Sequence, residues 1–416
     1  MNRSGPNKTL DASGVRANHR RLLLQILWEQ GRMSRADLAR ATGLSRSTIT
    51  VITADLLRGD LVQELGAGSS RGGRRPVVLG FNHDARLAVG VDLGASHITV
   101  GLVNLKGEVL AWRHRNHPVR DQPDSTMALV SRLIQDLLDE EPHAADRVLG
   151  IGLGLPSPVL PDSPPRLSTV LMPRWDGVDV AAQLIGDFHL PVYMDNDGNL
   201  GALAEVRWGA AKGHRNVALV KLSTGVGLGL VIGGEIYRGA HGLAGEFSHV
   251  SVDANGPKCV CGQRGCLVLL AGSRFVVDRI RALCESRGEE PPSLPNTAAL
   301  VAVAQQGHLT TTEVIGEAGR WLGVGVTGLV NLFNPSIVVL GGALSRAGHA
   351  LTEPIIEAVT NHTRWMGIPP VEIVPTRLDG QDVMIGAATL VFDNSLASAG
   401  FIRPKLMADQ PHLQRG

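Results

Sequence analysis

Cys259, Cys261 and Cys266 lie within eight residues of one another in a chain that has only four cysteines. So few cysteines in 416 residues cannot form a disulfide scaffold. Thiolates at this spacing can share one metal ion, and His249 completes a Cys3His set suited to tetrahedral zinc. Because four protein ligands leave no open coordination position, the pattern predicts a structural Zn²⁺ site. The alternative is three reduced, buried thiols near an unrelated histidine, and Cys284 is expected to be an ordinary core residue.

A second group of chemically active side chains lies in the segment MDNDGN, at positions 194–199. Asn196 and Asp197 place an amide beside a carboxylate just before a predicted helix. A carboxylate can accept the proton of an alcohol that attacks a phosphoryl group. The same residue types also cap helices, and on the residues alone capping is the simpler interpretation.

Glycine-marked, β-rich runs recur along the chain and alternate with helical patterns such as 125–139 and 312–332. Alternating strands and helices predict an α/β architecture. A single glycine-rich turn is more often only a turn than a phosphate-binding loop. The order of these turns is more informative than any one of them, and their residues are Asp92 and Gly94, then Thr224, Gly225 and Gly227, then Gly341 and Gly342.

This order resembles the nucleotide-binding series of actin/hexokinase-like sugar kinases. Within that group, the segments GAHGLAGEFSHV, CVCGQRGC and NLFNPSIVVLGG resemble the ROK family, which contains both sugar kinases and DNA-binding repressors. The resemblance covers about residues 18–392 and implies a two-lobed, sugar-kinase-like body. It implies sugar-binding roles for Asn196, Asp197, Glu246 and His249, with Asp197 at the position of the catalytic general base. His249 would use one ring nitrogen for the sugar and the other for zinc.

The chain departs from this kinase pattern at three places. Ala95, Ser96 and His97 stand where the family typically has Gly, Thr and Lys. Val268 stands at the place of a sugar-binding Glu, and Leu171 at the place of an Asn. Phosphoryl transfer depends mainly on positioning of the phosphates. We therefore expect a vestigial base, little or no kinase activity, and no working ATP and Mg²⁺ cofactor.

The elements ahead of this body predict a winged helix-turn-helix. A first helix carries apolar residues at helical spacing and ends near Gly31. Ser34 begins a second helix, with Asp37 three residues on to complete a capping box. Ser45 begins a third helix after a turn at 42–44. Two short strands around 66–75 then form the hairpin called the wing.

Two sets of residues in this region could contact DNA. Short polar side chains and an arginine near the start of the third helix suit base edges in the major groove. Arginines at the wing tip could neutralise phosphates or enter a minor groove. The alternatives are a plain three-helix bundle and a solvated loop. The predicted recognition set is Arg46, Ser47, Thr50 and Val51, and the wing set is Arg71, Arg74 and Arg75.

The charge distribution agrees with this division of the chain. Residues 1–80 carry 13 Lys and Arg against 6 Asp and Glu, a charge of +7, whereas the remainder carries 27 against 33, or −6. We expect a tail at 1–17, a winged helix-turn-helix domain at 18–81, a ROK-like domain at 85–395 and a tail at 396–416. The polar N-terminus and the lack of a long apolar run predict a cytoplasmic protein without membrane contact.

The leading hypothesis is a transcriptional regulator, a repressor of carbohydrate-related genes whose body binds a sugar or sugar derivative. Its recognition helices must reach grooves of double-stranded operator DNA roughly 34 Å apart, which implies a homo-oligomer, a dimer or a dimer of dimers. One alternative is an ATP-dependent sugar kinase with an accessory DNA-binding domain. Another is a ligand-blind regulator whose body serves only for dimerisation.

Overall fold

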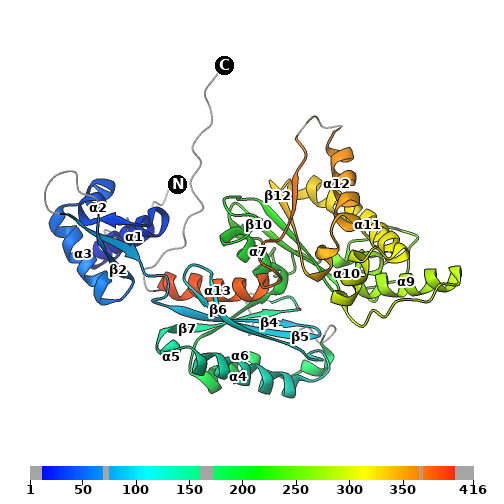
Figure 1. Ribbon diagram of the computed structural model, residues 1–416, viewed down its shortest axis with the longest axis horizontal. Helices are drawn as coiled ribbons and strands as arrows, with labels where there is room; N and C mark the ends of the chain where they lie inside the picture. Colours follow the sequence, from blue (N-terminus) through cyan, green and yellow to red (C-terminus); the bar gives the residue numbers. More distant parts are fainter. Residues whose placement is uncertain (1–11, 69–74, 160–171, 365–366, 368, 399–416) are drawn as a thin grey trace, which may run out of the picture.

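The computed structural model describes residues 12–68, 75–159, 172–364, 367 and 369–398. Figure 1 shows a small N-terminal head beside a larger body built of two lobes. The head is a winged helix-turn-helix and the body is an α/β unit with two separate five-stranded sheets, so the predicted fold class is confirmed. Among the helices that the structure describes, none combines the length and the apolarity needed to cross a bilayer.

The head contains three helices and a three-stranded sheet. Ser34 caps the second helix in the expected capping box with Asp37, and Ser45 caps the third. Gly43 takes the left-handed conformation that the turn between these helices requires, with φ +70°. The strand order is β1-β3-β2, and β1 is an element that the sequence did not suggest. The bounds are α1 (Ala12–Gln30), β1 (Met33–Ser34), α2 (Arg35–Thr42), α3 (Arg46–Arg58), β2 (Val62–Ala67) and β3 (Val77–Phe81).

The first lobe of the body is a sheet of order β6-β5-β4-β7-β8, in which β4, β7 and β8 run parallel. Helices α4 and α6 cover one face of this sheet with apolar side chains, and α13 packs against the other. The bounds are β4 (Leu87–Gly94), β5 (His97–Asn104), β6 (Val109–Asn116), α4 (Pro123–Glu140), α5 (Ala144–Arg147), β7 (Val148–Leu155), η1 (Pro173–Trp175), α6 (Val180–Phe188), β8 (Val192–Asn196) and α13 (Asp382–Ser398).

The second lobe repeats this topology, with the order β11-β10-β9-β12-β13. Helix α7 packs on one face of the sheet, and α9, α11 and α12 contribute to a large apolar core on the other. The bounds are α7 (Asp197–Arg207), β9 (Val217–Leu222), β10 (Val226–Ile232), β11 (Glu235–Ile236), η2 (Phe247–His249), α8 (Val268–Ala271), α9 (Ser273–Arg287), α10 (Thr297–Gln305), α11 (Leu309–Phe333), β12 (Ile337–Gly341), η3 (Ala343–Ala347), α12 (His349–Arg364) and β13 (Glu372–Pro375).

Helices α7 and α13 join the two lobes by packing against each other between the sheets (Figure 1). A Cβ added at Gly386 of α13 would lie 1.9 Å from the carbonyl oxygen of Leu200 in α7. Only glycine permits so close an approach of the two helix backbones. The lobes therefore meet along a tight helix pair, and the C-terminal ends of β4 and β9 lie near the N-terminal ends of these helices.

The head and the body share one apolar core. Buried residues from α1 and α3, among them Leu27 and Leu56, belong to the same cluster as Val391 and Phe392 of α13. Trp28 of α1 also lies edge-on to Phe81 of β3. Helix α1 begins at Ala12, inside the segment expected to be a tail, and α13 continues to Ser398.

Candidate functional site

The four predicted metal ligands come together. The ligand atoms of His249, Cys259, Cys261 and Cys266 all lie within 4.8 Å of one another. Nδ1 of His249 faces the thiols, 3.6 Å from Sγ of Cys259, and the sulfurs of Cys261 and Cys266 are 3.5 Å apart. One nitrogen and three sulfurs at such separations are a donor set that fits tetrahedral Zn²⁺. Because Nδ1 faces the thiols, Nε2 of His249 is left for another partner.

Asn196 is the N-cap of α7, which is the helix-capping role that its residue type suggested. Its side-chain oxygen accepts from the backbone N–H groups of Gly198 and Asn199 at 2.9 and 3.4 Å. Its amide nitrogen donates to the carbonyl of Ser157 at 3.3 Å. Helix α7 thereby fixes Asn196 and Asp197 at the end of β8, at the junction between the lobes.

Asp197 and Glu246 are neighbours, although 49 positions separate them in the sequence. Cβ atoms added at Gly198 and at Gly245 would lie 2.9 and 2.4 Å from the same carbonyl oxygen, that of Leu228 in β10. Glu246 is exposed to solvent. Its surroundings nevertheless remove part of its hydration and raise its pKa, and the negative charge of Asp197 acts in the same direction. The oxygens of this pair are of the kind that can accept hydrogen bonds from hydroxyl groups.

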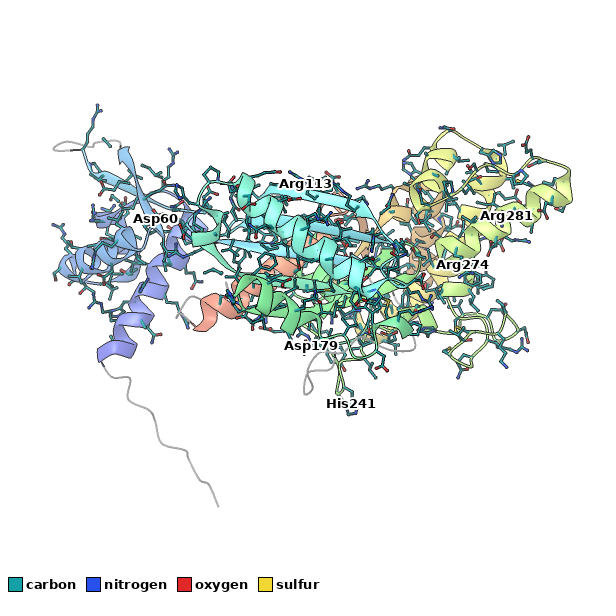
Figure 2. All side chains as sticks on the ribbon, turned by 90° about the horizontal axis from the view of Figure 1, so that it is seen from below. Asp60, Arg113, Asp179, His241, Arg274 and Arg281 are labelled. Atoms are coloured by element: carbon teal, nitrogen blue, oxygen red, sulfur yellow. The ribbon has the colours of Figure 1, made fainter. Side chains whose placement is uncertain are left out.

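Figure 2 shows His241 at the tip of the loop that leads to Glu246, projecting from the body. The same view places Arg274 and Arg281 of α9 at the end of the molecule opposite Asp60 of the head. Asp197 at the start of α7 and Glu246 at the start of η2 both belong to the body, so a ligand held by them would bind outside the head.

The side chain of His97 covers the first of the nucleotide-loop equivalents, which consists of Asp92 and Gly94. The ring of His97 lies over Gly94, where an added Cβ would come within 2.0 Å of it. Nε2 of His97 is 3.1 Å from Oδ2 of Asp92, and the ring stacks on His114. Burial alone would raise the pKa of Asp92, but the charges of Lys221 and His97 outweigh burial and lower it. This geometry supports the expectation of an impaired phosphate loop.

The remaining loop equivalents lie at the corresponding edge of the second sheet. Gly341 of β12 is the register partner of Lys221 in β9. The turn that contains Thr224, Gly225 and Gly227 joins β9 to β10. A methyl group of Val268 lies 4.0 Å from where a Cβ of Gly225 would be, so Val268 borders this turn. Gly342 has φ +78°, and a Cβ there would lie 2.3 Å from the carbonyl oxygen of Leu222.

Lys221 is a site residue that the sequence reasoning missed. Its ammonium donates to Oδ2 of Asp197 at 2.8 Å, although only 7% of the residue is exposed. The signal was a charged residue inside the apolar strand VALVKL, since an unpaired lysine is almost never fully buried. Arg238 was missed as well, and it forms an ion pair with buried Asp195 one residue before Asn196.

In the head, the predicted recognition residues lie on the exposed side of α3. Arg46, Ser47, Thr50 and Val51 are exposed, whereas Ile49 and Leu56 are buried. Helix α3 lies on the outer flank of the head, away from the body (Figure 1). This helix is accessible to a DNA major groove along its length.

The wing is formed by β2 and β3, and its described arginine is exposed Arg75. The backbone N–H of Gly68 donates to the carbonyl of Pro76 at 2.8 Å across the base of the wing tip. Arg71 and Arg74 lie outside the described residues. Arg35 of α2 donates to Thr53 in α3 and to Glu64 in β2, each at 3.2 Å, and so ties the wing to the recognition helix.

Comparison with known proteins gives the affiliation of this fold and site. Residues 88–394 match the model of the ROK family, and residues 16–63 match that of winged helix-turn-helix DNA-binding domains. The chain belongs to the ROK family. It is 30% identical over 386 residues to a protein named xylose repressor from Bacillus subtilis strain 168, covering 93% of this chain and 98% of that protein.

Solved ROK structures of two kinds resemble the chain. One is a ROK transcriptional regulator, a homologue of the Escherichia coli Mlc protein, with TM-score 0.73, 27% identity and coverage of 92% of this chain and 98% of that one. The other is a ROK glucokinase from Streptomyces griseus with bound glucose and AMPPNP, with TM-score 0.62, 26% identity and coverage of 73% and 98%. The match to the regulator covers 92% of this chain, which is enough to include both head and body. The match to the kinase covers 73%, close to the share of the chain that the ROK body makes up.

Proposed function

We propose that this ROK protein is a transcriptional repressor that holds an operator with α3 and the wing and releases it when a sugar binds in the body. This proposal rests on the observation that the winged helix-turn-helix shares an apolar core with a body in which Asn196, Asp197 and Glu246 converge. The similarity to a xylose repressor over almost the whole of both chains supports this function.

The effector that fits this site is a neutral monosaccharide. Asp197 and Glu246 offer acceptors to hydroxyl groups, and charge-assisted bonds of this kind are about twice as strong as neutral ones. Nε2 of His249 adds a third polar atom. Val268 supplies no such bond beside the turn of β9 and β10, so the set of sugars that bind should differ from that of ROK kinases. D-xylose and D-glucose are the first sugars to test, given the names of the relatives.

Zinc serves as a structural cofactor in this proposal. A Zn²⁺ ion held by His249, Cys259, Cys261 and Cys266 supplies no reaction step, because four protein ligands complete its coordination. It would fix the loop between η2 and α8 and with it the ring of His249. Loss of the ion would then loosen one wall of the sugar site.

The working form is a homo-oligomer in the cytoplasm, a dimer or a dimer of dimers. Two recognition helices related by a two-fold axis must lie roughly 34 Å apart to enter successive major grooves. A change in the angle between lobes that alters this spacing is sufficient to abolish binding to an operator.

A sugar kinase with an accessory DNA-binding head is the second candidate, and the observation that favours it is the presence of Asp197 at the base position. The His97 ring over Gly94 and the ammonium of Lys221 on Asp197 oppose it. Phosphoryl transfer requires bound metal and well-placed phosphates, and we expect neither ATP nor Mg²⁺ to bind productively.

One experiment separates the two functions. Genomic fragments bound by the purified full-length chain are selected, and binding is repeated with D-xylose, D-glucose and N-acetylglucosamine, beside an ADP-release assay with the same sugars. We expect specific fragments, release by at least one sugar, and no ADP above background. Sustained ATP-dependent phosphorylation would overturn the repressor proposal in favour of the kinase.

A further inference from the structure

Lys221 lies among three carboxylates that come from three other elements of the body. Asp197 is the first residue of α7 and Asp382 is the first residue of α13, whereas Asp92 lies near the C-terminal end of β4. All three act on Lys221 electrostatically: burial would lower the pKa of its ammonium, but the charges of Asp197, Asp92 and Asp382 raise it instead. Lys221 is therefore a permanent cation at the point where the two lobes and their connecting helices meet.

Two of these carboxylates each have one buried oxygen that accepts no hydrogen bond from any residue in the described part of the chain. These two atoms are Oδ1 of Asp92 and Oδ2 of Asp382. The two residues are 4% and 2% exposed, so solvent cannot compensate them. A buried, unpaired carboxylate oxygen is costly unless positive charge lies nearby. Clustered carboxylates of this kind are the donor set that hard divalent cations prefer.

We infer that Lys221 is a built-in substitute for a divalent cation at this end of the sugar site, and that it holds Asp197 as a hydrogen-bond acceptor instead of a base. The second part rests on the proposed function, because it assumes that a sugar hydroxyl reaches Asp197. Lys221 is thus a positioning residue that separates sugar binding from phosphoryl transfer.

The contacts of Asp197 show how this works. Oδ1 accepts from the backbone N–H of Gly198 at 2.8 Å and Oδ2 accepts from Lys221 at 2.8 Å. Each oxygen keeps a lone pair for a sugar hydroxyl, so Asp197 can still bind a sugar. Removing the proton of that hydroxyl would place a neutral carboxyl group against a buried ammonium and break the ion pair. The sugar is therefore bound and released unchanged.

The same ammonium also fixes the relation between the lobes. Lys221 belongs to the second sheet and Asp92 to the first, so their attraction links the two lobes without an exchangeable ion. A metal-dependent site would change its charge with metal supply, whereas a covalently attached cation does not. The response to a sugar then needs no divalent cation among these carboxylates, and the only metal it depends on is the structural zinc.

The test is a Mn²⁺ titration of the zinc-loaded, full-length chain without sugar, followed by electron paramagnetic resonance of free Mn²⁺. Wild type should show no saturable Mn²⁺ site that depends on Asp92. Lys221→Met should gain one site per chain, and the double variant Lys221→Met with Asp92→Asn should lose it. Lys221→Arg, which keeps the charge, should behave as wild type.

Lys106→Met is the matched control, since Lys106 forms a 2.9 Å ion pair with Glu108 on the surface. It should leave Mn²⁺ binding unchanged. Circular dichroism shows whether Lys221→Met folds. If it does not, the double variant Lys221→Met with Asp382→Asn, which has one uncompensated negative charge fewer, is titrated instead. The same gain of one Mn²⁺ site per chain is expected. A wild type that already binds Mn²⁺ through Asp92, or a folded Lys221→Met variant without the gain, would overturn the inference. Because no sugar is added, these results are distinguishable from a failure of the repressor proposal.

Discussion

The indole ring of Trp28 in the head lies 6.0 Å from that of Trp208 in the body, measured between ring centroids. Trp208 is the C-cap of α7, the helix that begins with Asp197. Its ring N–H donates to the hydroxyl of Thr389 in α13 at 2.9 Å. One 11-residue helix therefore leads from the candidate sugar site to the DNA-binding head.

Trp208→Ala should weaken the effect of sugar on operator binding while leaving operator binding without sugar nearly unchanged. The substitution removes the contact between α7 and α1, and allosteric couplings are typically about 1–3 kcal/mol. Fluorescence anisotropy of labelled operator, with and without the releasing sugar, measures this. Trp112→Ala, on exposed strand β6, is the control. A full sugar response in Trp208→Ala would show that the signal does not pass through this contact.

Arg46→Ala and Arg75→Ala should weaken DNA binding in different ways. Arg46 lies on the exposed start of α3, so its loss should cost about 1–3 kcal/mol on the preferred operator and relax base preference. Arg75 lies in the wing, so its loss should weaken all sequences alike and reduce the log–log salt slope by about one unit. Titrations on operator and random DNA at several salt concentrations separate the effects. Unchanged discrimination in Arg46→Ala would mean that the recognition helix is wrongly assigned.

Cys261→Ser should release zinc and impair the sugar response before it affects the head. A metal that binds only the folded state contributes folding free energy, so its loss loosens the loop around His249. Metal analysis and operator release by sugar are the readouts. Cys284→Ala, at a buried cysteine outside the cluster, should retain one zinc ion per chain. Absence of zinc from wild type purified without chelator would contradict the Cys3His site.

Val268→Glu should strengthen sugar binding without creating a kinase. The new carboxylate would border the turn of β9 and β10 and could accept from two hydroxyl groups, a gain of about 1–3 kcal/mol if the bonds are otherwise unmade. The His97 ring would still cover Gly94. Calorimetric titration with D-xylose, D-glucose and N-acetylglucosamine, beside an ADP-release assay, tests both statements. Tighter sugar binding by wild type than by the variant would show that Val268 itself is part of the specificity.

The stability of the body should fall as pH rises through the folded-state pKa of Glu205. Burial raises this pKa above its usual value, although Thr376 and the N–H of Ala210 donate to the carboxyl. A carboxyl with a raised folded-state pKa binds more protons when folded, so its stabilisation is complete below the unfolded pKa and lost above the folded one. Glu205→Gln should flatten this part of the profile in denaturant unfolding across pH. A profile identical to that of wild type would contradict the assignment.

The sequence alone was sufficient for the three helices of the head and for the Cys3His cluster. Ser34, Asp37 and Ser45 act on backbone groups within three residues, and the three cysteines lie on one short segment, so local spacing determines both features. The ordered glycine turns indicated an actin/hexokinase-like sugar kinase, and the short segments GAHGLAGEFSHV, CVCGQRGC and NLFNPSIVVLGG indicated the ROK family; all of these signals are local. The alternation of strands and helices indicated an α/β architecture but not the repetition of one topology in both lobes.

Tertiary structure alone decided how the distant pieces act on one another. Asp197 and Glu246 become neighbours only because Gly198 and Gly245 both approach the carbonyl of Leu228. In the sequence, Lys221 is a single charge in an apolar strand, and only the packing of the lobes brings the charges of Asp92 and Asp382 close enough to act on it. Trp28 and Trp208 are 180 positions apart in the chain. Such contacts depend on the packing of whole helices and sheets, in which many weak apolar contacts far apart in sequence jointly set the distance between any two side chains.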